Sequence, residues 1–373
     1  MTFKKKTNII FILVFLALSI SVGLFNYIVD PYGIRNIRAN NFSIYHYSRD
    51  MIYTYINQTK NIKFDGVVVG GSSAGMVFQP EIFNRDTSKN FAMLSLEGIS
   101  PQEILTLLTY FIDIHPEIKT VFMSVEPLQY MKCYSSKTLP EKPTTFLYDF
   151  IKLYYSFDTT FLSFKMLNDR KESFDENDNI AYLFNKKIKY TYDNCENDNF
   201  LYIKQVKKIL DDKNIEIKFF ILPVHSLFLS DLYLKKKIDV LNRLKYKLVE
   251  LAPFYDMAYV NKYTKDPFLY FWKDVIHLSQ FLSPYIYEVL FYGKDYPELS
   301  IIINSENIDK KIKLQNILIK NYIEENKNYV EKYVNYAYDF KMDGAYDDKR
   351  YLKDIPEPYK TRFYTEYEEY YKK

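Results

Sequence analysis

The sequence is poor in the residue types that build metal centres and disulfide frameworks. Its 373 residues include two cysteines, four histidines and one tryptophan. Cys133 and Cys195 have no metal-ligand spacing, and the histidines stand far apart in the chain. We therefore expect no metal and no other cofactor. Cys133 and Cys195 are compatible with one disulfide in an oxidising compartment and equally with two free thiols.

The sequence also has no large excess of charge of either sign. Lysine and arginine total 50 against 47 acidic residues, which leaves a formal charge of +3, and no strongly basic stripe occurs. Nucleic acid is therefore not expected as a partner. Tyrosine, by contrast, is abundant at 38 residues. Tyrosine rings suit a sugar-binding surface, although composition alone does not place them on one.

Glycine is scarce, yet four of the nine glycines fall within the ten residues 66–75. Concentrated glycine marks a backbone that turns tightly or comes close to another group. The β-branched residues 67–69 predict a buried parallel strand, and the glycines after it place Ser72 and Ser73 where a helix would begin. A serine at such a turn either presents a nucleophilic hydroxyl beside the positive end of the helix or only caps the helix.

The N-terminus carries an uncharged apolar run over about residues 8–29, preceded by three lysines at residues 4–6. About 20 apolar residues are enough to cross a bilayer core as a helix. A cleaved signal peptide has a shorter apolar region and a small-x-small cleavage site, for which residues 19–22 are a poor candidate. We therefore predict that residues 1–30 form an uncleaved, single-pass anchor in the cytoplasmic membrane. The lysines are expected in the cytoplasm and the rest of the chain outside it.

Beyond the anchor, predicted strands alternate with predicted helices. Strands are expected to end at residue 70 and to cover residues 90–96, 119–126, 215–222 and 254–258, with helices at 76–84, 101–114, 201–212 and 235–251. This alternation predicts an α/β fold in which helices cover both faces of a parallel sheet. Such sheets bind ligands at the carboxyl ends of their strands.

Two stretches interrupt the alternation. About residues 130–200 lack clear periodicity and indicate an insertion with some helix, either a lid or a partner-binding element. Residues 299–373 combine a charged amphipathic helix pair with a tail rich in tyrosine and glutamate. We therefore divide the chain into the anchor, an α/β domain at residues 31–298 that contains the insertion, and a helical, charged, tyrosine-rich extension.

A second group of catalytic residue types lies near the end of the α/β region, where Asp274 and His277 are three positions apart. A serine hydroxyl becomes an effective nucleophile when an imidazole takes its proton and a carboxylate orients that imidazole. The D-x-x-H pattern alone is common in proteins. Combined with the serine turn some 200 residues upstream, it predicts a Ser-His-Asp site.

Together, Gly71-Ser72-Ser73 and Asp274-Val-Ile-His277 resemble the motifs of the SGNH (GDSL-type) hydrolase superfamily. The similarity is greatest to its membrane-anchored envelope branch, which includes the lipoteichoic-acid D-alanylation protein D and the alginate O-acetylation proteins. The stretch Asn26-Tyr-Ile-Val-Asp-Pro-Tyr-Gly33 and Pro223-Val-His225 also resemble this branch. The resemblance covers about residues 24–293. It implies a flavodoxin-like, three-layer parallel sheet with an N-terminal transmembrane helix and a helical C-terminal extension.

The resemblance also implies roles for individual residues. Ser73 is the nucleophile, His277 the general base and Asp274 the partner that orients the base. Gly98 contributes its N–H to the oxyanion hole, beside the N–H of the nucleophile. The family often adds an Asn from a Gly-x-Asn after the third strand, but here that strand ends Ser124-Val-Glu126. Loss of one such donor costs about 10²–10³ in rate.

Some of these residues also fit interpretations other than an SGNH hydrolase site. His225, at the expected end of a strand, either lines the site and binds substrate or is structural. Residues 71–75 also fit the G-x-S-x-G elbow of α/β-hydrolases and again select Ser73, but that elbow normally follows several strands and this one follows the first. The glycine spacing excludes a P-loop and the dinucleotide-binding fingerprint.

The sequence therefore predicts a membrane-anchored, extracytoplasmic serine esterase or O-acyltransferase that acts on an envelope polysaccharide or another acylated glycan. The alternative is a non-catalytic accessory protein that binds a polymer or a membrane-bound O-acyltransferase. The unmatched Gly-x-Asn favours the accessory protein, and the complete Ser-Asp-His set favours the enzyme.

Overall fold

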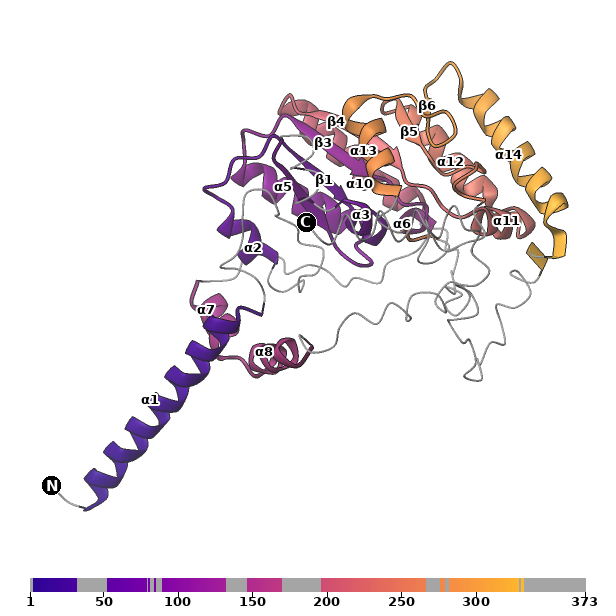
Figure 1. Cartoon of the computed structure of the whole chain (residues 1–373). Coiled ribbons are helices and arrows are strands. Elements are labelled where there is room, and N and C mark those ends of the chain that lie inside the picture. Colours follow the sequence, from indigo (N-terminus) through magenta and orange to yellow (C-terminus); the bar gives the residue numbers. More distant parts are fainter. Residues whose placement is uncertain are drawn as a thin grey trace. The chain divides into compact units, whose positions relative to one another are not determined.

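The computed structural model describes residues 3–31, 52–78, 80, 84, 89–131, 146–169, 196–265, 276–278, 282–328 and 330–331 (Figure 1). The chain divides into two units. One is drawn from residues 1–39, 46–62 and 138–176, and the other from residues 40–45, 63–137 and 177–373. The first unit contains α1 (Phe3–Val29), α2 (Ile52–Gln58), α7 (Phe146–Tyr155) and α8 (Phe157–Asp169).

The second unit alternates strands and helices along the chain. Its described strands are β1 (Gly66–Gly70), β2 (Phe91–Ser95), β3 (Thr120–Ser124), β4 (Glu216–Ile221), β5 (Phe254–Asp256) and β6 (Ile301–Ile303). Its described helices are α3 (Ser72–Val77), α5 (Pro101–Ile114), α6 (Pro127–Met131), α10 (Glu196–Asp212), α11 (Ser226–Leu234), α12 (Ile238–Val249), α13 (Ser283–Tyr292) and α14 (Ile308–Glu325).

The strands form one sheet in the order β2-β1-β3-β4-β5-β6. Strands β1 to β5 are parallel, and β6 runs antiparallel to β5. The predicted α/β class with a mostly parallel sheet is therefore confirmed, although the sheet is mixed. The first five strands follow the flavodoxin-like order 2-1-3-4-5, in which the chain reverses direction between β1 and β3. In such sheets the ligand crevice lies at this switch point, outside the carboxyl ends of the strands.

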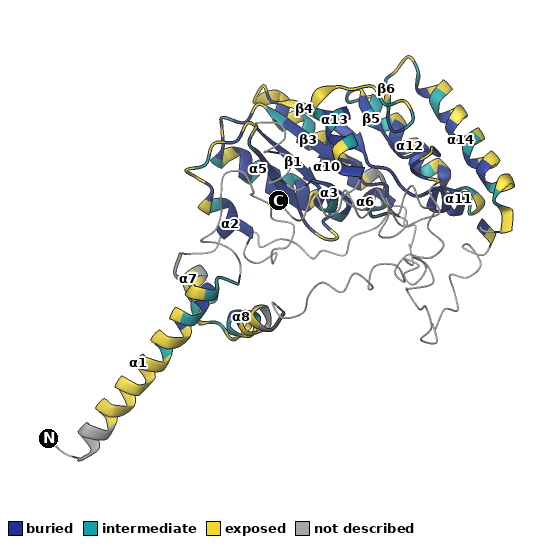
Figure 2. Ribbon diagram, viewed as in Figure 1, coloured by how far each residue is buried: buried dark blue, intermediate teal, exposed yellow. Residues whose placement is uncertain are grey.

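Helices cover both faces of the sheet. On one face Val68, Phe122 and Phe220 share a buried core with residues of α3 and α13. On the other face α5 and α10 pack against each other and contact β1 and β4. The connections through α3 and α5 run in opposite directions across the sheet, so right-handed crossovers place these helices on opposite faces. The strands between them are buried (Figure 2).

Helix α5 begins at Pro101, directly after the N-cap residue Ser100. Ser100 Oγ accepts the N–H of Glu103 (3.2 Å), and the Glu103 carboxylate accepts the N–H of Ser100 (2.8 Å). This capping box, with Pro101 in the first turn, satisfies donors that a helix leaves unpaired at its start. The predicted helix at residues 101–114 is confirmed.

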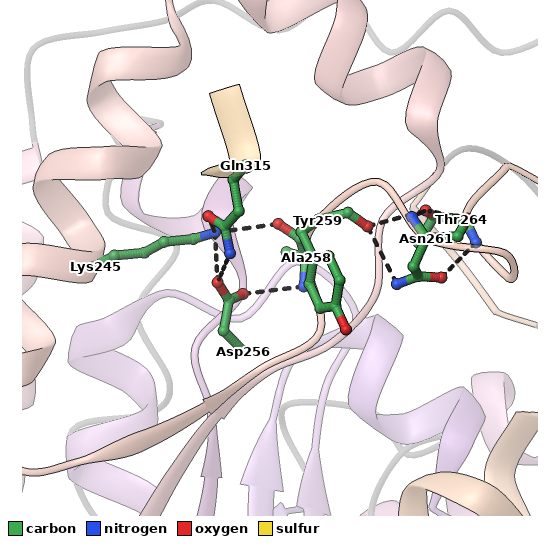
Figure 3. Close-up of polar contacts among 7 residues, drawn as sticks. All are labelled: Lys245, Asp256, Ala258, Tyr259, Asn261, Thr264 and Gln315. Carbon is green, nitrogen blue, oxygen red and sulfur yellow. Dashed lines mark hydrogen bonds and ion pairs between the residues drawn. The ribbon is translucent and has the colours of Figure 1, made fainter. Parts of the chain in front are cut away.

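The last described elements are built into the second unit. Strand β6 pairs with β5, and α14 packs against α11 and α12. In a buried polar cluster, Lys245 of α12 forms an ion pair with Asp256 of β5 (2.7 Å) and donates to Gln315 of α14 (2.8 Å) (Figure 3). Gln315 donates in turn to Asp256 (2.7 Å). The region predicted as an extension, residues 299–373, thus begins inside the α/β unit, and residues 332–373 lie outside the described residues.

In the first unit, α1 is long and apolar enough over Asn8–Val29 to cross a membrane, and most residues of that stretch are exposed (Figure 2). Helices α7 and α8 pack against α1. The predicted anchor at residues 1–30 therefore falls on a continuous apolar helix. The predicted insertion at residues 130–200 contributes α7 and α8 to this unit and the start of α10 to the second.

Candidate active site

The turn after β1 and the short segment around His277 meet in the second unit. Ser72 begins α3, and its Oγ lies 2.8 Å from Nε2 of His277, although the residues are 205 positions apart in sequence. Both residues are partly exposed. When the ring hydrogen is on Nδ1, the Nε2 atom accepts the serine proton. This is the arrangement of an activated nucleophile and its general base.

Ser73, the predicted nucleophile, makes a different contact. Its Oγ donates to the backbone oxygen of Ile276 (3.1 Å), and the residue is only 6% exposed. Successive residues of a helix point about 100° apart, so the two serines at the start of α3 face different neighbours. Ser72 faces the imidazole, and Ser73 fastens the residue before His277. The sequence allowed this outcome, because Gly70-Gly71-Ser72 is a G-x-S pattern as well.

The backbone at the serine turn is held in one orientation. The Gly71 carbonyl accepts the hydroxyl of Ser95 at the end of β2 (2.5 Å) and the N–H of Gly75 (3.0 Å). Because the peptide unit is planar and trans, the N–H of Ser72 points away from that carbonyl. The backbone N–H of the nucleophile is a donor that serine hydrolases aim at the oxyanion. The turn is therefore preorganised before any substrate arrives.

Glu126, two residues after β3, is a site residue that the sequence analysis identified only as a departure from Gly-x-Asn. Its carboxylate accepts the N–H of Ala74 (3.2 Å), and the residue is 9% exposed. Burial raises the pKa of Glu126, while the N–H of Ala74, the imidazole of His277 and the N–H groups of Gly71 and Ser73 lower it to a smaller extent. A buried carboxyl group thus stands at the switch point, in electrostatic contact with the histidine.

Gly71 is required by the side chains around it. A Cβ at this position would overlap Nε2 of Gln129 and lie 2.5 Å from Oε2 of Glu126. The Gln129 amide therefore lies directly against the serine turn. It is 4% exposed, and its Oε1 and Nε2 have no hydrogen-bond partner among the described residues. Sequence reasoning missed Gln129 because α6, which carries it, falls at the start of the stretch interpreted as an insertion.

An unpaired amide at this place is chemically informative. Burying a polar group without a partner costs about 1–3 kcal/mol, and native proteins keep few such groups. The amide can donate through Nε2 to a carbonyl oxygen or an oxyanion. Gln129 is therefore a candidate for the side-chain donor that the unmatched Asn would supply.

The structure describes two of the three remaining predicted site residues, Gly98 and His225. Gly98 lies in the turn after β2 with φ +58°, a left-handed conformation that favours glycine. His225 is the N-cap of α11: its Nδ1 accepts the N–H of Leu227 (3.1 Å), and the residue is 3% exposed. This bond supports the structural interpretation of His225. Asp274 lies outside the described residues.

Within the described part of the chain, no group of three or more His, Cys, Asp or Glu side chains is arranged to hold a metal ion. Cys133 and Cys195 lie outside the described residues. The described site contains a hydroxyl, an imidazole, a buried carboxyl group, an amide and oriented backbone N–H groups.

Comparison with known proteins adds little to this geometry. No protein-family model matches the sequence, and a search of curated proteins found no match. A solved structure described as "a putative platelet activating factor from Streptococcus pneumonia" is similar with a TM-score of 0.37 and 14% sequence identity. The match covers 65% of this chain and 92% of the other. A likeness of this size carries no argument about function.

Proposed function

We propose that this protein is a membrane-anchored, extracytoplasmic serine esterase or O-acyltransferase that acts on acyl esters of a cell-envelope glycan. The observation that supports this most directly is the 2.8 Å contact between Ser72 Oγ and His277 Nε2. The contact joins two distant parts of the sequence at the turn after β1, beside the switch point where sheets of this order bind ligands. We assign the nucleophile to Ser72, in place of Ser73.

The chemistry follows the acyl-enzyme scheme. His277 Nε2 takes the proton of Ser72 as Oγ attacks the acyl carbon, and the imidazolium returns that proton to the departing alcohol oxygen. Water or a sugar hydroxyl then attacks the acyl carbon as it gives its proton to His277, the bond between that carbon and Ser72 Oγ breaks, and the imidazolium returns the proton to Oγ. Asp274, three positions before the base, is the proposed partner for His277 Nδ1. Its role is to hold the tautomer in which Nε2 accepts the serine proton.

The negative charge that develops on the acyl oxygen needs donors that are already in place. We assign the Ser72 N–H, oriented by the Ser95 bond to the Gly71 carbonyl, and the Gln129 amide to this role. Gly98 stays the proposed third donor, from the turn after β2. Glu126 accepts the N–H of Ala74, and the N–H groups of Gly71 and Ser73 also lower its pKa.

The fold and the N-terminal helix support the finer parts of the proposal. A flavodoxin-like strand order, a serine turn after the first strand and a histidine near the end of the α/β unit are the features expected of an SGNH hydrolase. The apolar helix over Asn8–Val29 supports anchoring in the cytoplasmic membrane. An anchored domain outside that membrane would meet envelope polysaccharides and their acyl groups.

One observation favours the second candidate, a non-catalytic accessory protein that binds a polymer or a membrane-bound O-acyltransferase. The family position that holds an amide donor is occupied by Glu126, and an ionised carboxylate near the acyl oxygen would repel the oxyanion. Burial raises the pKa of Glu126, which favours its neutral form. The state of this one carboxyl group therefore separates the two candidates.

The test compares the two neighbouring serines in the full-length chain. We expect the wild type to hydrolyse p-nitrophenyl acetate and to be labelled at Ser72 by a fluorophosphonate, with the labelled residue identified by peptide mass spectrometry. Ser72→Ala is expected to lower the rate by at least about 10³-fold, since loss of a serine nucleophile costs up to about 10⁶.

Ser73→Ala is the matched control. It removes the hydroxyl that bonds to Ile276 but leaves the nucleophile, so we expect slower turnover with Ser72 still labelled. Labelling of Ser73, or loss of activity only in Ser73→Ala, would contradict the assignment of Ser72. A wild-type chain that neither turns over nor reacts with the phosphonate would favour the accessory protein.

A further inference from the structure

The C-terminal part of α1 is joined to α7 and α8 by a closed set of hydrogen bonds. Asn26 is 1% exposed, and its Nδ2 donates to the Tyr154 carbonyl (2.8 Å) and to Thr160 Oγ1 (2.9 Å). Its Oδ1 accepts the hydroxyl of Ser163 (2.9 Å). A buried amide with these partners fixes the position of α1 relative to both helices.

The helices also approach each other closely. A Cβ on Gly23 would lie 2.7–2.8 Å from the Tyr155 side chain, so glycine lets α1 and α7 approach closely without displacing that ring. The rings of Phe25 and Phe164 lie 4.8 Å apart and join α1 to α8. Small residues at close crossings and polar side chains bonded across helices are typical of helix packing in membranes.

Helix α8 has its polar and apolar faces reversed relative to a helix on a water-soluble protein. Thr159 and Ser163 are fully buried, whereas Phe157, Phe161 and Phe164 are 84%, 64% and 55% exposed. The three phenylalanines are spaced i, i+4, i+7 and therefore form one stripe. A surface helix in water buries such a stripe and exposes its hydroxyls, so the surroundings of α8 must favour apolar groups.

Helix α7 extends this surface. Tyr148, Ile151 and Tyr155, at spacing i, i+3, i+7, are 50%, 51% and 40% exposed. Contiguous exposed apolar surface of this kind marks a site of interaction with another protein or with a membrane. Tyrosine in particular is enriched where a protein crosses from hydrocarbon to water.

We propose that α7 and α8 lie in the membrane interface beside the C-terminal end of α1, with the stripe of Phe157, Phe161 and Phe164 in the acyl chains of the outer leaflet. This rests on the proposed membrane anchoring of α1. The contacts to α1 fall at Gly23, Phe25 and Asn26, within about 9 Å of Val29 at 1.5 Å per residue. Interfacial helices lie about 5–10 Å deep at this same boundary.

Lipid is the occupant that the contacts favour, because the stripe is continuous with a helix whose own surface is apolar and exposed. Residues 9–16 of α1 are all more than 40% exposed, and Gly23 and Asn26 are the buried residues of the Asn8–Val29 stretch. One solvent therefore explains α1, α7 and α8 together. A second copy of the chain that covered α7 and α8 would still leave the exposed apolar surface of α1 unexplained.

The test introduces one tryptophan into the stripe and measures how strongly brominated lipid quenches its fluorescence. Full-length Phe161→Trp is reconstituted in phosphatidylethanolamine–phosphatidylglycerol vesicles, with and without lipids brominated at carbons 6 and 7. The wild-type protein, whose single tryptophan is Trp272, gives the background fluorescence that is subtracted. We expect bromolipid to reduce the remaining fluorescence, which comes from the introduced tryptophan, by at least about twofold. The control Leu234→Trp, at an exposed apolar position on α11 of the second unit, should be unaffected.

Flotation of the same vesicles separates this inference from the anchor on which it rests. A Phe161→Trp chain that floats and resists carbonate extraction, but whose introduced indole is unquenched by bromolipid and open to acrylamide, overturns the placement of α8 and leaves the anchor intact. Shielding of the introduced indole from both quenchers also overturns it, in favour of a protein occupant such as a second copy. A chain that does not float overturns the anchor and the inference together.

Discussion

Glu126 is the residue whose ionisation most affects the proposed site. Burial raises its pKa above the ordinary value of 4.5, so the folded protein holds a proton that the unfolded chain releases at lower pH. Between these two pKa values the folded state binds more protons, and stability therefore falls as pH rises through that window. Below the unfolded value the effect disappears, because both states are protonated.

We expect Glu126→Gln to remove this dependence, since the amide cannot ionise and its oxygen still accepts the N–H of Ala74. The melting temperature of the variant should exceed that of the wild type above the folded pKa and coincide with it in acid. Thermal unfolding measured from about pH 4 to pH 9 checks this, with the exposed Glu97→Gln as the control. Equal pH profiles for the wild type and Glu126→Gln would show that Glu126 ionises as freely in the folded protein as in the unfolded chain.

The substitution Gly71→Ala adds one methyl group to the serine turn. Its Cβ would meet the ends of the Gln129 and Glu126 side chains, and overpacking of this kind costs about 1–3 kcal/mol. Because the Gln129 amide is a proposed oxyanion donor, we expect Gly71→Ala to lower kcat by at least about 10²-fold, the cost of one donor.

Gly293→Ala is the matched control for Gly71→Ala. Gly293 caps α13 with φ +63° and has open space around a Cβ, so alanine there costs about 1–2 kcal/mol in stability through strain alone. We expect that variant to keep its kcat. Similar losses of kcat in both variants would mean that the loss reflects stability and not the geometry of the turn.

Among the secondary-structure elements, the buried cluster that joins α12, β5 and α14 provides a sharp test. Burial lowers the pKa of Lys245, and the ion pair with Asp256 acts in the opposite direction. Lys245→Met leaves Asp256 buried without its cation, and breaking a buried pair in this way costs about 3–5 kcal/mol. We expect Lys245→Met/Asp256→Asn to recover much of the loss, because asparagine still accepts the N–H of Ala258 without carrying a charge.

Denaturant unfolding of the two variants measures this effect. The exposed pair of Lys262 and Glu298 (2.9 Å) is the matched control, since surface pairs contribute about 0–1 kcal/mol. Lys262→Met is therefore expected to change stability little. A loss in Lys245→Met no larger than in Lys262→Met would mean that α14 is held by its apolar contacts alone.

The elements that could be predicted are those whose own sequence carries their signal. The β-branched run of β1 and the capping box of α5 are local features, and both elements lie where they were expected. Strand β6 has three residues and depends on its pairing with β5. Helices α7 and α8 fall in the stretch predicted as an insertion with some helix, but no bounds were predicted for them because no clear cap or periodicity was recognised there.

The same contrast between local and distant signals explains which residues of the candidate site could be predicted from the sequence. The sequence predicted Ser73 and His277 at one site, because each lies in a recognisable local pattern, whereas Ser72 is the serine that contacts His277. Which serine faces the histidine depends on where α3 begins, and a shift of one residue turns a side chain by about 100°. Glu126 and Gln129 could not be assigned because their role comes from contact with Gly71, a residue more than 50 positions away.

For the whole molecule, the proposed membrane anchor raises the question of which side of the membrane the second unit faces. Three lysines precede the apolar helix and Arg35 and Arg38 follow it, and we propose the orientation in which the three lysines lie in the cytoplasm. An esterase or acyltransferase of envelope glycans requires this orientation, because its substrate is outside. The orientation and the proposed substrate class therefore stand or fall together.

Protease added to intact spheroplasts checks the orientation. We expect an N-terminally tagged chain to be cut after about residue 30, leaving a short membrane-bound fragment that carries the tag. A cytoplasmic protein in the same cells should stay intact, and a known external protein should be digested. If the full chain survives until the membrane is permeabilised, the second unit faces the cytoplasm. Envelope glycans would then be excluded as its substrate, while the reactivity expected of Ser72 toward a phosphonate would be unaffected.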